Sequence, residues 1–553
     1  MKTKNKPFSA LLLTPCIFST VSYIRAAEVP PGTTLSARQE LVRNNFTEPA
    51  SLDPHKSESD VEFNIIADIF DGLIRVKHDG TIEPRLAEKW EVKDNRVWVF
   101  YLRPGIQWSS GEPITAQDVV WSWKRLVAPE TGSPYASYPG RMHIENASDI
   151  AEGKKPIDSL GVRALDRNTV QVTLNQPTSA FLLMLDHPSM VPVNRSVIDK
   201  AGNKWTQPGK LVSSGAYKLS DWVVNEKVVG VRNKLYWDDA HTVINKVTYL
   251  PVSSGAADVN RYKAGEIDIT YGVPEILYFS LKKSMPEQVR TSPYLSTYYY
   301  EFNTTKAPFN DPRVRLALNM ALDKNIITGK VLGQGQRDAW LVSQPEIGGV
   351  KIERADYGSW SRDKRIAEAK RMLDEAGFNA LTPLKFDLLY NISESHQRIA
   401  IAASSMWKKN LGVEARLQKQ EWKTLLDAKR TGNFDVVRYS WIADYDDAIS
   451  FLNNFRTGDA QNTTKYSNPA YDDILDKASL AGSHEERRKY YQQAEDILAR
   501  DVPTIPVFHS VRINLVKPYV GGYLPDALGR YFTQDMYIRV VEGADAQSNE
   551  NSR

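Results

Sequence analysis

The chain has 553 residues, of which 42% are hydrophobic and 25% are charged, and its formal net charge is +3. This composition is typical of a soluble globular protein. The length exceeds what one hydrophobic core accommodates, which excludes a single small domain and predicts two or three domains.

Residues 1–26 have the pattern of a cleavable secretory signal peptide. No later apolar run reaches the roughly 18 residues of a membrane span, so we expect export to the periplasm without an anchor. Removal of this segment changes the formal charge from +3 to −1, which leaves no basic excess for a nucleic-acid partner. The signal contains Lys2, Lys4, Lys6, an apolar stretch over 8–24, Arg25, Ala26 and the only cysteine, Cys16. The mature chain is therefore expected to have no disulfide.

The first half of the chain is expected to contain short strands, helices and many turns. A capping box at Thr115–Asp118 starts a helix, whose apolar face carries Val119, Val120, Trp123 and Leu126. The segment 97–102 is apolar throughout, which predicts a strand that is buried on both faces. Other expected elements are a strand near 40–45, a helix within 62–76 that ends in a short strand, a hairpin at Asp79-Gly80, and strands at 169–174 and 246–250.

The second half shows a regular alternation of helices and strands after residue 360. Before it, Asp311 and Pro312 are the N-cap and first-turn proline of a helix. Its buried stripe contains Val314, Ala317, Leu318 and Ala321. The alternation predicts an α/β domain with a largely parallel sheet. The expected helices are 363–376, 396–411, 422–430 and 486–500, and the expected strands are 384–390, 413–417 and 434–440.

The segment 434–451 concentrates polar and aromatic residues at the end of a predicted buried strand. Arg438 and three aromatic residues precede or flank a loop with Asp444, Asp446 and Asp447. Two interpretations remain open: an edge strand that runs into an acidic, solvated loop, or the wall of a site for a zwitterionic, partly apolar ligand. The aromatic strand 298–303, which contains Glu301, has the same two interpretations.

Enzyme motifs are missing from the sequence. It has no HExxH zinc motif, no phosphate-binding GxxxxGK[ST] loop and no GxSxG nucleophile elbow. The acids at 444–447 begin like a calcium loop, but Ala448 and Ile449 break the ligand pattern. We therefore expect no cofactor, no metal and no catalytic residue. A periplasmic hydrolase that uses the paired acids is the rival class.

Four segments resemble the signature of peptide- and nickel-binding extracellular solute-binding proteins. They are Ile82–Trp90, Trp98–Arg103, Trp108–Gly111 and Pro113–Asp118. Further segments are similar to the oligopeptide-binding and murein-tripeptide-binding members of that family. These segments include Ser133–Ser137, Lys204–Gly209, Thr297–Glu301, Met406–Gly412, Gln420–Thr424 and Pro518–Tyr523.

The resemblance implies an α/β fold with two lobes that close on the ligand and an extra inserted α/β domain, three domains in all. Residues 27–70, 195–295 and 512–541 would form the first lobe, 71–194 the extra domain, and 296–511 the second lobe. Residues 542–553 would be a disordered tail.

The resemblance also implies roles for individual residues. Asp444 would hold the α-ammonium of the ligand, and Arg438 and His396 would meet the carboxylates of short peptides. The peptide backbone would pair with Ser440, Trp441 and Ile442 and with the segment from Glu58 to Asp60. The side-chain pockets would be lined by Tyr135, His187, Tyr294, Tyr299, Glu301, Trp422, Lys429 and Trp441.

Several positions depart from the oligopeptide-binding pattern. Ser296 and Ile442 stand where paired cysteines are usual, and Leu332 stands where a lysine meets longer peptides. Ligand length therefore remains open. The expected function is a monomeric periplasmic receptor, not an enzyme, which captures peptides of about two to five residues and delivers them to the permease pair and ATPases of a membrane ABC importer. The alternative is a dedicated murein-tripeptide receptor for cell-wall recycling.

Overall fold

The computed structural model describes residues 27–541, apart from residues 95, 179, 293, 349 and 482 and the side chain at 484. The predicted signal peptide and the predicted tail lie outside the described residues. None of the described helices is both long and apolar enough to cross a membrane.

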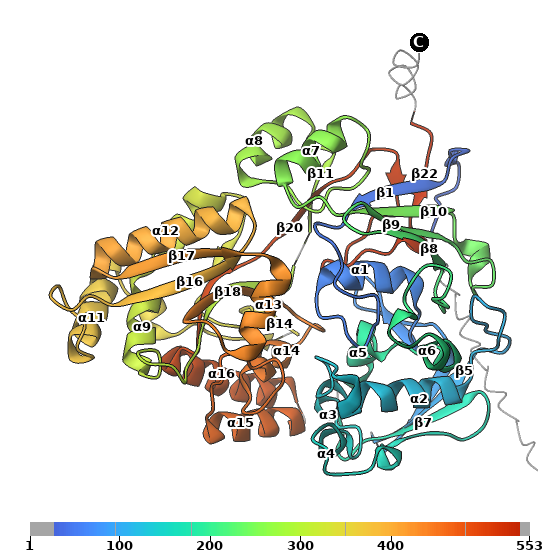
Figure 1. Ribbon diagram of the computed structural model, residues 1–553, viewed down its shortest axis with the longest axis horizontal. Coiled ribbons are helices and arrows are strands. Elements are labelled where there is room, and N and C mark those ends of the chain that lie inside the picture. Colours follow the sequence, from blue (N-terminus) through green and yellow to red (C-terminus); the bar gives the residue numbers. More distant parts are fainter. Residues whose placement is uncertain are drawn as a thin grey trace, which may run out of the picture.

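The first lobe contains a four-stranded sheet in the order β1-β10-β9-β8 (Figure 1). Strand β1 is parallel to β10, and the other neighbours are antiparallel. Helix α1 packs against β8 over a core that includes Ile65, Ile66 and Tyr217. The strands and helix are β1 (Glu40–Asn44), β8 (Tyr217–Val223), β9 (Lys227–Arg232), β10 (Lys246–Leu250) and α1 (Asp60–Ile69).

A second four-stranded sheet, in the order β4-β5-β7-β6, packs on helix α2 below the first sheet (Figure 1). The capping box of Thr115 and Asp118 is confirmed, and the predicted apolar face of α2 is buried. The prediction that 97–102 is buried on both faces is wrong: only Phe100 and Leu102 are fully buried. Helix α2 covers one face of this antiparallel sheet, and the other stays half exposed. The elements are β4 (Ala87–Lys93), β5 (Val97–Leu102), β6 (Val162–Ala164), β7 (Thr169–Thr173) and α2 (Ala116–Val127).

The second lobe is built on a six-stranded sheet in the order β13-β19-β12-β18-β16-β17. The prediction of a largely parallel sheet is wrong, because only β16–β17 and β16–β18 are parallel. Helices α12 and α13 make the crossovers between those three strands, whereas β12 and β19 come from distant segments and pair antiparallel. The strands are β12 (Ser296–Phe302), β13 (Arg337–Asp338), β16 (Lys385–Asn391), β17 (Glu414–Gln420), β18 (Val436–Ile442) and β19 (Thr504–His509).

The helices that the sequence predicted for this part of the chain are present in the structure. Asp311 caps α9, whose predicted stripe is buried. The main helices are α9 (Pro312–Ala321), α11 (Arg362–Glu375), α12 (Glu394–Leu411), α13 (Trp422–Thr431), α15 (Pro469–Leu480) and α16 (His484–Asp501). Smaller elements include β2 (Ile74–Val76), β3 (Ile82–Pro84), α5 (Phe181–Leu185), α7 (Gly255–Lys263), α8 (Glu275–Ser284) and β22 (Tyr537–Ile538).

Two connections join the lobes. The chain leaves the first lobe after β11 (Val289–Ser292) and enters β12, and it returns from β19 to β20 (Arg512–Leu515), which pairs with β11. Because β11 and β20 pair side by side, the two connections lie together at one edge of the lobes (Figure 1). The exact domain boundaries stay a prediction.

Candidate ligand-binding site

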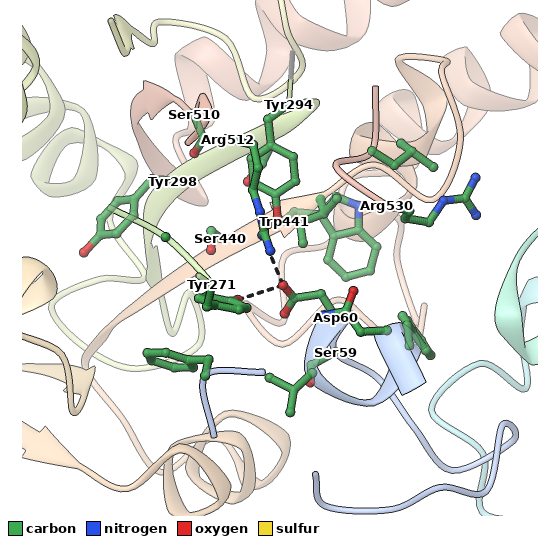
Figure 2. Close-up of a pocket in the computed structure, with 18 of the residues that line it drawn as sticks. Ser59, Asp60, Tyr271, Tyr294, Tyr298, Ser440, Trp441, Ser510, Arg512 and Arg530 are labelled. Atoms are coloured by element: carbon green, nitrogen blue, oxygen red, sulfur yellow. Dashed lines mark hydrogen bonds and ion pairs between the residues drawn. The ribbon is translucent and has the colours of Figure 1, made fainter. Parts of the chain in front are cut away.

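A cavity of about 400 Å³ lies between the lobes. Its walls come from the start of α1 and from Tyr271 in the first lobe, from β18 in the second, and from both connections (Figure 2). The start of α12 completes the wall of the second lobe. Twelve of the predicted site residues line it. They are Glu58, Asp60, Tyr135, His187, Tyr294, His396, Trp422, Arg438, Ser440, Trp441, Ile442 and Asp444.

Strand β18 offers a free backbone edge to this cavity. It pairs with β16 only at Val436 and Val437, while its other edge pairs with β12 up to Ile442. The amide of Ala443 donates to the carbonyl of Leu295 on the β12 side. Since alternate residues of an antiparallel strand direct their N–H groups to opposite sides, the amides of Ser440 and Ile442 face the free edge. This edge can accept an added strand.

Asp444 is a buried carboxylate with incomplete partners at one end of the cavity. It is 9% exposed. Tyr135 donates to its Oδ1 over 3.3 Å, and His187 Nε2 lies 3.4 Å from the same oxygen. The Ser189 amide donates to His187 Nδ1, so the proton of the neutral ring is on Nε2. Oδ2 has no hydrogen-bond partner among the described residues. Because a buried carboxylate needs a compensating charge, this oxygen favours a cationic ligand group.

Arg438 is the opposite case, a buried cation without a carboxylate within ion-pair distance in the described structure. It donates to Asn391 over 3.1 Å and to Ser440 over 3.0 Å, and its Nε has no partner. Burial, reinforced by Arg438, lowers the pKa of His396 well below its usual value, so the imidazole is neutral. Ser393 caps helix α12 beside His396, and a helix N-terminus favours anions. This end of the cavity is therefore an anion site.

Three predicted site residues do not line the cavity: Lys429, Tyr299 and Glu301. Lys429 donates to Glu301 over 2.7 Å, with both side chains 5% exposed, and Thr463 donates to the same oxygen over 2.8 Å. The Lys429 ammonium also lies 3.2 Å from the centre of the Tyr439 ring. The expectation that Glu301 offers its charge to a basic ligand group is not met here, because Lys429 already neutralises it. These residues lie behind the cavity wall, where Lys429 contacts the wall residue Tyr439.

One of the two remaining loop acids differs from the interpretation as a solvated loop. Asp447 is not a solvated loop acid: it is 4% exposed and pairs with Arg487 over 2.9 Å. Asp446 is exposed and accepts a hydrogen bond from the Gly348 amide. Tyr439, one of the three aromatic residues of the segment 434–451 that the sequence offered as a possible site wall, lines the cavity and stacks on Trp422 with ring centres 5.9 Å apart.

The sequence reasoning also missed Arg512 and Tyr271. Both line the cavity, and both approach Asp60 (Figure 2). The available signal was an arginine near the start of a predominantly apolar segment, Val511 to Val516. That signal does not distinguish a site residue from an edge charge.

Ion pairs join the lobes around the cavity. Arg430 donates to Glu58 over 2.7 Å, and Arg141 Nε donates to Asp459 over 2.9 Å. Arg398 and Ser395 of α12 both contact Glu275. Burial raises the pKa of Glu58, although Arg430 opposes the shift. The described structure is thus a closed arrangement.

Comparison with known proteins agrees with this geometry. The model of the bacterial extracellular solute-binding proteins, family 5 Middle, matches residues 81–463. The chain is 49% identical over 538 residues to the periplasmic oligopeptide-binding protein OppA of Salmonella typhimurium, covering 97% of this chain and 99% of that protein. It is 45% identical over 507 residues to the periplasmic murein peptide-binding protein MppA of Escherichia coli, covering 92% and 94%.

The structure superposes better on a peptide complex of one relative than on an unliganded open form of another. The complex of Haemophilus influenzae OppA with RPPGFSPFR superposes with a TM-score of 0.89 at 41% identity, covering 92% of this chain and 100% of that one. The unliganded open form of MppA superposes with a TM-score of 0.67 at 44% identity, covering 93% and 99%. The fold is therefore the two-lobed, three-domain fold that the sequence predicted. By sequence and structure, the chain belongs to the bacterial extracellular solute-binding proteins of family 5.

Proposed function

We propose that the protein is a periplasmic receptor that captures short peptides between its two lobes and delivers them to a membrane ABC importer. One observation carries the proposal. Among the described residues, the same cavity holds a buried carboxylate without an arginine or lysine partner, Asp444, and a buried cation without a carboxylate partner, Arg438, with a free strand edge between them. A peptide supplies the matching ammonium, carboxylate and backbone groups.

Strand addition explains how such a receptor can accept many sequences. Backbone hydrogen bonds to the free edge of β18 are common to all peptides. Side chains then meet aromatic walls such as Trp422, Tyr439 and Trp441, which tolerate different shapes when water fills the gaps. Closure removes the charged ends from bulk water, so each end needs its protein partner. A receptor of this kind does no chemistry on the ligand.

Periplasmic location and partnership with a permease pair and its ATPases are part of the same proposal. They rest on the secretory pattern of residues 1–26 and on the names of the relatives, which are periplasmic binding proteins. That the receptor is a monomer stays a prediction.

Mass spectrometry separates the receptor from the rival hydrolase. The purified protein is incubated with a free-amine tripeptide, and the bound and free fractions are analysed. We expect a one-to-one complex that releases the intact tripeptide on denaturation. Cleavage products that accumulate with time would contradict the proposal. No complex with any peptide would also contradict it.

A dedicated murein-tripeptide receptor is the second candidate. The relation to MppA, at 45% identity, makes it a candidate, and the observation that favours it is Leu332, which places an apolar side chain in the cavity wall. Competition between a murein tripeptide and trialanine distinguishes the two. A dedicated receptor prefers the murein tripeptide by orders of magnitude, and a general receptor binds both.

Ligand length follows from the spacing of the two charged ends. Residues 438 and 444 are six positions apart, or about 20 Å of extended chain, and the reach of both side chains shortens the gap to three or four extended residues. Leu332 cannot pair the carboxylate of a longer peptide. In calorimetry on a series of lysine peptides, we expect affinity to peak at three or four residues. A clear optimum at five or more would contradict this assignment of Arg438.

A further inference from the structure

Arg512 is a second cation in the cavity wall, far from Arg438 in the sequence. It opens β20 at the connection between the lobes. Figure 2 shows its guanidinium extending toward Asp60, close to Tyr271 and Tyr294. The guanidinium carbon lies 4.6 Å from the centre of the Tyr271 ring and 5.4 Å from that of Tyr294. The two rings hold the side chain in place, so its position is defined before a ligand arrives.

The hydrogen bonding of Arg512 is incomplete. Its only hydrogen-bond contacts within the described residues are from Nη1, to Asp60 Oδ2 at 3.5 Å and to the Tyr294 hydroxyl at 3.4 Å. Both are longer than the usual range of about 2.7–3.2 Å. Nε is buried without a partner, and Nη2 makes no hydrogen bond to the described residues. The Nε–Nη2 edge is thus free, and two parallel N–H groups of this kind bind a carboxylate in a bidentate manner.

Asp60 does not complete this site. The Tyr271 hydroxyl donates to the same Oδ2 over 2.7 Å, so the closer partner of that oxygen is a neutral phenol. Arg530, which also lines the cavity, differs in this respect. Its Nε donates to Asp526 over 2.8 Å, and Asp186 accepts from its Nη2. In Figure 2 its guanidinium points away from Asp60. Arg530 is saturated, whereas Arg512 can accept another carboxylate.

We propose that Arg512 forms a subsite for an acidic side chain, so that the receptor prefers peptides with glutamate or aspartate at one position. The proposal rests on the proposed function and names its substrate class more closely. The ligand carboxylate binds the free Nε–Nη2 edge, while Nη1 keeps its long contact with Asp60. The terminal carboxylate remains at Arg438, so the preferred ligands carry two anionic groups and one ammonium.

Paired peptides that differ only in charge test this subsite. Trialanine is compared by calorimetry with six variants that carry either glutamate or glutamine at the first, second or third position. In the wild-type protein, we expect glutamate to bind at least tenfold tighter than glutamine at one position, since a hydrogen bond to a charged group is involved. In Arg512→Gln, that ratio should fall to within threefold of one. The ratio within each variant cancels any general loss of folded protein.

Two further variants test whether Arg512 is the residue that binds the acidic side chain. Asp60→Asn removes the competing carboxylate and should increase the preference for glutamate. Arg163→Gln changes an exposed arginine that does not line the cavity, and its ratio should stay within threefold of the wild-type ratio. Amidation of the peptide C-terminus should weaken binding without removing the glutamate preference, because that carboxylate belongs to Arg438.

The outcomes separate this inference from the proposed function. If trialanine binds and glutamate gives no advantage at any position, the acidic subsite is wrong and the peptide receptor stands. If matching lysine variants of trialanine, measured in addition, bind tighter than the glutamine variants and Asp60→Asn abolishes that preference, Asp60 and not Arg512 selects the side chain. If none of the seven peptides binds, the proposed function itself fails.

Discussion

Replacing Asp444 with asparagine is expected to weaken the binding of a free-amine tripeptide by about 10²-fold, the largest effect on affinity of any single cavity residue. In the closed state, the ligand ammonium lies in a cavity without bulk water, and among the described residues of the cavity wall Oδ2 of Asp444 is the one fully buried carboxylate oxygen that lacks a partner. Removing one member of a buried charge pair costs about 3–5 kcal/mol, or on the order of 10² to 10⁴ in the dissociation constant. Asparagine keeps the shape and one acceptor, so the lower end applies. Isothermal titration calorimetry measures the change.

Asp446 is the matched control for this experiment. It is exposed, two residues away, and accepts one backbone hydrogen bond, so Asp446→Asn should change affinity by less than about 1 kcal/mol. Asp447 is unsuitable, because its burial against Arg487 makes it structural. An N-acetylated tripeptide should bind the wild type poorly and lose little more in Asp444→Asn. If Asp444→Asn binds within threefold of the wild type, the ammonium anchor is a different residue.

Glu301→Gln is expected to destabilise the second lobe by about 3–5 kcal/mol, because it leaves the Lys429 ammonium buried without its carboxylate. Both side chains are almost inaccessible, and the carboxylate accepts from Lys429 and Thr463 through one oxygen. Burial lowers the pKa of Lys429, and Glu301 opposes that shift. Without Glu301, the lysine must lose its proton or expose itself. A fall of several degrees in the melting temperature, followed by circular dichroism, is the expected result.

Two variants serve as controls for the buried pair. The double change Glu301→Gln with Lys429→Met should recover most of the lost stability, since replacing both charges by groups of similar shape is nearly neutral. Glu353→Gln, in the exposed pair with Lys351, should cost less than about 1 kcal/mol. If Glu301→Gln keeps its melting temperature but loses tripeptide affinity, then Glu301 belongs to the ligand pocket after all.

The sequence by itself determined the local elements of this protein and the two ends of its cavity. Hydrophobic periodicity and capping act over a few residues. The capping box at Thr115–Asp118, the N-cap Asp311 and the strand that leads to Asp444 could therefore be predicted. Resemblance to the family then identified Asp444 and Arg438 as candidates, and both line the cavity.

Only the tertiary structure decided which polar residues face the ligand and which face the core. Strand β12 lies between β18 and β19, and α13 brings Lys429 onto Glu301, which turns a predicted pocket acid into a buried ion pair. Helix α16 buries Asp447, and β20 brings Arg512 to Asp60 across 452 positions. Such contacts depend on pairings between distant segments, which leave no periodic signal in either segment alone. Local patterns therefore predicted the elements, whereas long-range packing set the partners of each charge.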